Sequence, residues 1–254
     1  MASVFLVAAA LTVAPALALL FYLLRRYEGY FEDARVFFAL IVGFFAGLVV
    51  AFLENVLFQF DHPSFVAAAG PAFAFSYFVV GYAFVETAAK TAVLGAGKFR
   101  RRKDTPYYGA ALGVGFGAML ALQSVAIALQ RGKILEQPID ATWVEVLLLL
   151  FALAAGNVLA SGAAGVWVGR GSADGKLWNG LFFGTLVQMA VLLLRWFSPA
   201  PGAGVAVLPS VAALVYGVTV VVLAQRRILD PIVPPEIRDQ VLKERRREQR
   251  KEMQ

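Results

Sequence analysis

The sequence of 254 residues contains no cysteine and only one histidine, His62. The lack of cysteine excludes disulfides, thiolate nucleophiles and Cys-ligated metals. A single histidine excludes sites that need two or three histidines from one chain, as the usual His-rich zinc sites do. A Ser-His-Asp triad would have to use His62, which lies in the short polar break DHPS. Carboxylates, amides and hydroxyls remain for chemistry, and we expect no metal and no other cofactor.

Charged residues are also scarce. Only 16% of the residues are charged, whereas 60% are hydrophobic, and the mean hydropathy is +0.71. Because a soluble domain of this length needs more polar surface, the composition predicts a polytopic membrane protein in contact with the lipid bilayer. The 23 Lys and Arg residues lie mostly in short clusters, so the net charge of +6 reports on topology. We expect no nucleic-acid partner.

The apolar runs predict an all-α fold, a polytopic bundle of about seven transmembrane helices. A bilayer core about 30 Å thick needs roughly 20 apolar residues in a helix. The third run is too long for one straight crossing, and we expect Pro71, or Gly95 and Gly97, to let part of it kink, tilt or protrude. The expected spans are residues 2–23, 36–60, 64–97, 107–130, 143–169, 178–197 and 204–225.

Basic residues distribute unevenly between the connecting segments. Segment 98–106, KFRRRKDTP, alone holds five, while the segments expected on the opposite side hold only Arg131 and Lys133. The positive-inside rule therefore predicts an N-terminus outside and a cytoplasmic C-terminus, with the cell membrane as the expected location. The first span has no basic region before it and is followed by an Arg pair, which favours a retained helix over a cleaved signal.

The sequence divides into a transmembrane bundle, residues 1–225, and a basic cytoplasmic tail, residues 226–254. Prolines interrupt the start of the tail, and PPE is typical of the opening of a helix, so we expect a C-terminal cytoplasmic helix. Its basic run either contacts anionic headgroups or an acidic partner, or belongs to a solvated helix whose acidic residues offset the bases.

Few ionisable residues lie within the expected spans, and such residues are functional candidates by default. Glu86 and Lys90 are four residues apart with the acid first, the favourable order for a pair on one helix face. We favour a site at Glu86, whereas Lys90 either pairs with it or extends toward the cytoplasmic surface. Glu54 is expected to pair with a neighbour at a helix end, and Asn55 to form a cap or an interhelical hydrogen bond. Whether Glu54 reaches Glu86 depends on helix packing.

Two glycine patterns predict close helix packing. Gly109, Gly113 and Gly117 recur every four residues in the fourth span, and Gly165 and Gly169 repeat that spacing in the fifth. Stripes of small residues let helix backbones approach closely. The packing would also bring polar side chains beside the stripes within contact distance of each other.

The order of these features resembles the PrsW-type intramembrane proteases, in the superfamily of CAAX-processing and bacteriocin-processing membrane proteases. ETAAK at 86–90 stands where that family has Glu-Glu-x-x-Lys, and a basic loop follows. GVGFGAMLALQ at 113–123 stands in the place of its Gly-rich span, and GNVLASGAAGVWVG at 156–169 in the place of its last motif. The resemblance covers roughly residues 25–170 and rests on order and spacing.

Several positions depart from the pattern of that family. Thr87 stands in the place of the second glutamate, Leu120 and Ala121 in the place of a Glu-Asn pair, and Asn157 in the place of the histidine. The resemblance implies that glutamate and histidine activate a water for peptide hydrolysis. Because asparagine cannot act as a general base, these replacements should lower the rate by orders of magnitude.

One hypothesis is a membrane-embedded hydrolase acting on a transmembrane or membrane-proximal peptide. Glu86 would be the base and Lys90 would set its ionisation. Thr87 and Asn157 would orient a water or hold an oxyanion, and Gln123 would line the site.

The alternative is a non-catalytic descendant that binds membrane segments or a partner membrane protein, with Glu86, Lys90 and Asn157 as a polar clasp. A transporter ranks lower, because the sequence shows no paired halves and few intramembrane charges.

Overall fold

The computed structural model describes residues 2–25, 27, 30–54, 67, 70–131, 141–197 and 207–237. Within these ranges the chain is helical and has no strand, which confirms the all-α prediction. The expectations for Asn55, for His62 and for the tail beyond Ile237 lie outside the described residues. The helices are α1 Ala2–Leu24, α2 Asp33–Phe52, α4 Pro71–Ser76, α5 Tyr82–Leu94, α6 Thr105–Arg131, α7 Ala141–Ala173, α8 Leu177–Trp196, α9 Val207–Ala224 and α10 Asp230–Ile232, with π-helical segments η2 Tyr77–Gly81 and η4 Gln225–Leu229.

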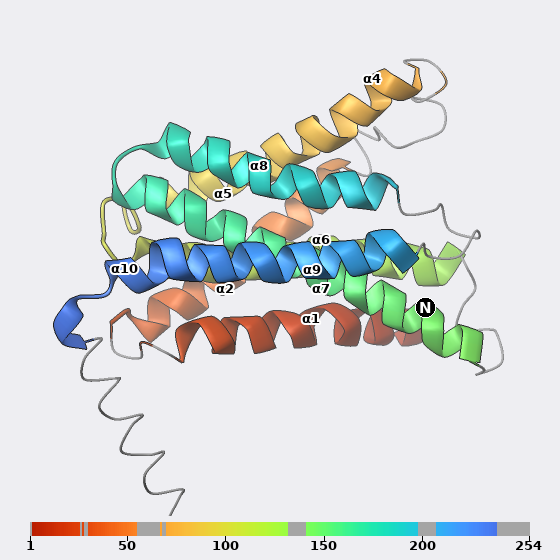
Figure 1. Ribbon diagram of the computed structural model, residues 1–254, viewed down its shortest axis with the longest axis horizontal. Helices are drawn as coiled ribbons and strands as arrows, with labels where there is room; N and C mark the ends of the chain where they lie inside the picture. Colours follow the sequence, from red (N-terminus) through yellow and green to blue (C-terminus); the bar gives the residue numbers. More distant parts are fainter. Residues whose placement is uncertain are drawn as a thin grey trace, which may run out of the picture.

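Seven helical runs in the described part of the chain are long and apolar enough to cross a membrane, and they lie side by side as a bundle (Figure 1). The chain is therefore an integral membrane protein. The runs are Ser3–Leu24, Asp33–Phe52, Pro71–Leu94, Thr105–Gln130, Trp143–Ala173, Leu177–Trp196 and Val207–Ile232.

The third and seventh spans differ from their expected ends. The third begins at Pro71, because the φ of 85° at Gly70 is not a helical conformation. The seventh continues through η4 to Ile232, because residues that follow the expected end at 225 remain buried in the bundle. The Tyr30 hydroxyl donates to the carbonyl oxygen of Ile232 at 3.0 Å, which fixes this extension to the segment between α1 and α2.

Helices α6 and α7 form the centre of the bundle. In the most apolar stretch of 18 residues of each of these two helices, 67% of the residues are buried, compared with 28–39% in the corresponding stretches of the other spans. A Cβ on Gly109 would overlap the carbonyl oxygen of Gly165, and a Cβ on Gly113 would overlap that of Ser161. The predicted close packing of the glycine stripes is confirmed, since no larger residue fits at these crossings.

The connecting segments that carry most basic residues lie at one end of the bundle. Arg102 of the segment between α5 and α6 pairs with Glu32, just before α2, at 3.1 Å. The Ser172 hydroxyl, near the end of α7, donates to the carbonyl oxygen of Leu94 at 2.6 Å. We call this the basic end, formed by residues 24–25, 27, 30–35, 95–104 and 170–177.

The outer helices expose large apolar side chains along their length. A monomeric soluble protein rarely exposes contiguous apolar surface of this extent, whereas lipid-facing helices require it. These faces indicate direct contact with the hydrocarbon of a bilayer. Examples are Phe5, Leu6, Phe21, Phe37, Phe45, Leu48, Phe182, Leu208 and Val215.

Candidate functional site in the bundle core

Glu86 and Lys90 form a buried ion pair on α5. Both residues are 0% exposed, and the Lys90 Nζ lies 3.9 Å from the Glu86 Oε2. The Lys90 amine also lies 4.4 Å from the ring centroid of Phe116 on α6, a cation–π contact. Lys90 therefore does not extend toward the surface, which excludes one of the two interpretations left open for it.

A second carboxyl group, that of Glu54, joins this pair. Glu54 follows α2 in a π-helical turn and is 2% exposed. The Tyr82 hydroxyl of α5 donates to the Glu54 carbonyl oxygen at 3.0 Å and holds this turn against α5. The Glu54 carboxyl acts on both members of the pair, Glu86 and Lys90. Neither Glu86 carboxylate oxygen has a hydrogen-bond partner of good geometry among the described residues. We call Glu54, Glu86 and Lys90 the carboxyl cluster.

The carboxyl cluster contains one acid more than its single lysine can neutralise. Arg195, near the end of α8, also acts electrostatically on Glu86, but it is partly exposed and its guanidinium lies 5.5 Å from the ring centroid of Phe78. Lys90 needs only one of the two carboxyl groups as its counter-charge.

Thr87 lies beside the carboxyl cluster and contacts α8. It is fully buried, and a Cβ at Gly184 would come within 2.8 Å of the Thr87 methyl group. The absence of a side chain at Gly184 thus lets α5 and α8 approach at this level. The hydroxyl of Thr87 has no hydrogen-bond partner among the described residues.

Asn157 of α7 is paired with Gln188 of α8. The Gln188 Nε2 donates to the Asn157 Oδ1 at 3.4 Å, and both residues are buried. Gln188 lies one turn beyond Gly184, so the amide pair adjoins the α5–α8 contact. Gln188 was not among the expected site residues, although an isolated amide in an apolar span is a signal that could have indicated it.

Gln123 does not belong to these contacts. It lies on α6, two turns beyond Phe116, and is partly exposed. Its side chain forms no hydrogen bond with another described residue. The structure thus connects Thr87 with α8, pairs Asn157 with Gln188, and leaves Gln123 apart from both.

Several buried polar atoms around α5, α7 and α8 have no hydrogen-bond partner in the part of the chain that the structure describes. Leaving such an atom unsatisfied costs about 1–3 kcal/mol, so native proteins contain few of them. Their concentration here sets this part of the core apart, because its donors and acceptors are not satisfied by described protein groups. The atoms are both Glu86 carboxylate oxygens, Thr87 Oγ1, Lys90 Nζ, Ser161 Oγ, Thr185 Oγ1 and Gln188 Oε1.

The described residues contain no group of three or more His, Cys, Asp or Glu side chains that could hold a metal ion. The carboxyl cluster offers two carboxylates and a cation, a combination suited to proton transfer. Carboxyl groups held together in a buried site can take different protonation states and so act as acid and base in one reaction.

A second polar network lies at the basic end, and there the charges are paired. Arg102 donates to both Asp104 oxygens at 3.1 Å, and the Tyr108 hydroxyl donates to Asp104 Oδ2 at 2.6 Å. Burial raises the pKa of the Asp104 carboxyl, but these hydrogen bonds outweigh it and hold that pKa below its usual value. The Asp104 hydrogen bond is likewise the main cause that raises the pKa of Arg102.

Comparison of the chain with family models, with curated proteins and with solved structures gave no match in any of the three.

Proposed function

We propose that this protein is an intramembrane hydrolase of the PrsW type that cleaves a transmembrane or membrane-proximal peptide. The observation that carries the proposal is the carboxyl cluster, with its excess acid and with Glu86 oxygens that lack hydrogen-bond partners. In this proposal Glu54, in the turn that follows α2, supplies the second carboxyl that Thr87 cannot provide within ETAAK.

The two carboxyl groups divide the acid and base work. The ionised carboxylate of Glu86 takes a proton from a water, and the water oxygen attacks the peptide carbonyl carbon. The protonated Glu54 then donates its proton to the leaving nitrogen as the C–N bond breaks. The Lys90 ammonium, 3.9 Å from Glu86, favours the ionised form of that carboxyl. A histidine is not required for these steps.

The neighbouring hydroxyl and amide groups serve the developing oxyanion and the bound peptide. Thr87 Oγ1 is unpartnered and adjoins Glu86 in the sequence, so its hydroxyl is available to the oxyanion. Gln188 keeps its oxygen free while its nitrogen bonds Asn157, so it can accept a hydrogen bond from a peptide N–H. π-helical segments lie beside Glu54 and at η2, and such segments occur frequently at functional sites.

The test compares wild type with Glu86→Gln and Glu54→Gln. Each protein is reconstituted in liposomes with a detergent extract of membrane proteins from its host, and new peptide termini are identified by mass spectrometry. Each substitution should lower the rate of terminus formation about 10²–10⁴-fold, the usual contribution of a general acid or base. Glu145→Gln is the matched control, because Glu145 is an exposed glutamate on α7. Termini that form at the same rate with wild type and Glu86→Gln would contradict the proposal.

A second candidate function is a non-catalytic scaffold that binds a transmembrane segment, and the amide pair favours it. Asn157 and Gln188 bind each other across α7 and α8, as a structural clasp would. This function predicts that a partner membrane protein co-purifies with the wild type in mild detergent but not with Glu86→Gln. Neither the wild type nor Glu86→Gln should generate new peptide termini. Recovery of the wild type without a partner would count against the scaffold.

We also propose that the basic end faces the cytoplasm and that the protein resides in the cell membrane. The support is the gathering of basic segments at one end of the bundle. Since the chain has no cysteine, a single introduced thiol reports its side without background. An impermeant maleimide applied to intact cells should label Glu145→Cys and spare Lys176→Cys. The reverse pattern would contradict this orientation.

A further inference from the structure

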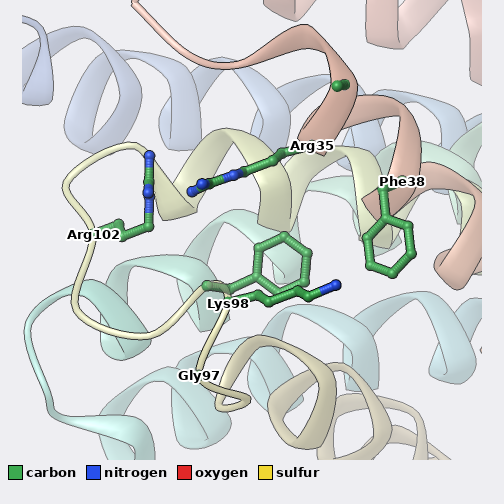
Figure 2. Close-up of a pocket in the computed structure, with 7 residues that line it drawn as sticks. Arg35, Phe38, Gly97, Lys98 and Arg102 are labelled. Atoms are coloured by element: carbon green, nitrogen blue, oxygen red, sulfur yellow. The ribbon is translucent and has the colours of Figure 1, made fainter.

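A pocket of about 550 Å³ opens at the basic end, between the first turns of α2 and the segment that joins α5 to α6. Figure 2 shows Arg35 and Phe38 projecting from α2, and Lys98 and Arg102 reaching in from the connecting segment. Ala34, Gly97 and Phe99 complete the lining. The polar part of the pocket is thus formed by three cations.

Two acidic groups neutralise part of this charge. Glu32 pairs with Arg35 at 2.7 Å and with Arg102 at 3.1 Å, and Asp104 pairs with Arg102. These bonds fix both guanidinium groups in place. Lys98 has no acidic partner among the described residues. The pocket therefore keeps one net positive charge.

One donor in the pocket wall is left without a partner. The Arg35 Nη1 is buried and has no hydrogen bond among the described residues, although the Nε of the same side chain binds Glu32. Beside it, the Lys98 amine lies 5.2 Å from the ring centroid of Phe38. A group bound here would receive donors from a preorganised guanidinium and from a lysine, the pair of residue types that binds phosphate.

The other side of the pocket is continuous with apolar surface. Phe38 lines the pocket and is itself exposed, and Phe37 and Phe45 of the same helix face outward. α2 is one of the membrane-spanning helices, so this surface lies against acyl chains. A ligand that combines an anionic head with hydrocarbon chains would fill the pocket and cover this face.

We propose that the pocket binds the phosphate of an anionic membrane lipid, with the headgroup between Arg35, Lys98 and Arg102 and the acyl chains along α2. Basic pockets between transmembrane helices on the cytoplasmic side are suited to such headgroups. This site is separate from the carboxyl cluster and does not depend on the proposed hydrolase activity.

The test places the full chain in nanodiscs of phosphatidylcholine with a minor fraction of phosphatidylglycerol, and measures retained phosphatidylglycerol by native mass spectrometry. Lys98→Gln should lower the apparent affinity about fivefold, since it removes a cation without disturbing the Arg102 pairs. Lys103→Gln is the matched control: it removes the same charge from the same segment, outside the pocket, and should change the affinity less than about twofold.

Equal losses with Lys98→Gln and Lys103→Gln would overturn the proposal, because the attraction would then belong to the whole basic segment. Wild type that retains no more phosphatidylglycerol than phosphatidylcholine would overturn it as well. A third arm adds inorganic phosphate in excess. Unchanged retention of phosphatidylglycerol supports a lipid site. If inorganic phosphate displaces the lipid and also binds equally well to the protein in pure phosphatidylcholine nanodiscs, the pocket is instead a site for soluble phosphate.

Discussion

Two polar regions of the molecule differ in how their charges are satisfied. At the basic end, Asp104 accepts hydrogen bonds from Arg102 and Tyr108. In the core, Glu86 and Lys90 are fully buried, 3.9 Å apart, and the Glu86 oxygens have no hydrogen-bond partner among the described residues. A network with its partners in place holds segments together, whereas unpartnered buried groups are retained at the expense of stability. The difference lies between the Asp104 network, whose partners are in place, and a core pair whose oxygens are left without hydrogen-bond partners.

The largest expected effect is that of Lys90→Met. Removing the lysine leaves two carboxyls buried together, and breaking a buried pair in this way destabilises by about 3–5 kcal/mol. The measurement is the free energy of unfolding by denaturant in a fixed detergent. Lys176→Met, at an exposed lysine of the basic end, should change it by less than about 0.5 kcal/mol. Equal effects of the two substitutions would remove the distinction between the regions.

A smaller effect is expected from Asp104→Ala at the basic end. It removes the acceptor of the Tyr108 hydroxyl and one of the two acidic partners of Arg102, which should cost about 1–3 kcal/mol of unfolding free energy. Asp174→Ala is the comparison, because the Arg170–Asp174 pair is of similar length, 2.7 Å, but exposed. Exposed pairs contribute about 0–1 kcal/mol. If Asp174→Ala destabilised as much as Asp104→Ala, burial would not explain the contribution of the Asp104 network to the free energy of unfolding.

The smallest effect is the pH dependence of the Asp104 contribution. Because the folded-state pKa of this carboxyl lies below the unfolded value of about 3.9, its contribution to stability is present above that pH and is lost as the pH falls through the folded-state pKa. The difference in unfolding temperature between wild type and Asp104→Ala should stay nearly constant from about pH 7 to about pH 5 and shrink as the pH falls below about 4. A difference that did not shrink below about pH 4 would exclude a charged Asp104 as its source.

The number and type of the helices could be predicted from the sequence, because an apolar run of the length of a bilayer has few other outcomes. The glycine stripes of α6 and α7 also indicated their contact correctly, since the spacing itself encodes the face. Helix ends were less predictable. The extension to Ile232 depends on the Tyr30 hydrogen bond, a contact between residues 202 positions apart in the sequence.

The site was predictable only in part. The Glu86–Lys90 pair follows from local spacing, but the approach of Glu54 depends on how α2 and α5 pack and on the Tyr82 hydrogen bond. The pairing of Asn157 with Gln188 likewise needs the antiparallel register of α7 and α8. Gln123, which was expected to line the site from the Gly-rich span, is partly exposed and forms no hydrogen bond with another described residue.

If the second carboxyl is kept for function at the expense of stability, the unfolding temperatures of Glu54→Gln and Glu86→Gln should show it. Either glutamine removes one acid of similar shape and leaves the other to partner Lys90, so both variants should unfold at or above the wild-type temperature. A fall as large as that produced by Lys90→Met, in either variant, would show that both carboxyls are structural and that neither is kept at the expense of stability.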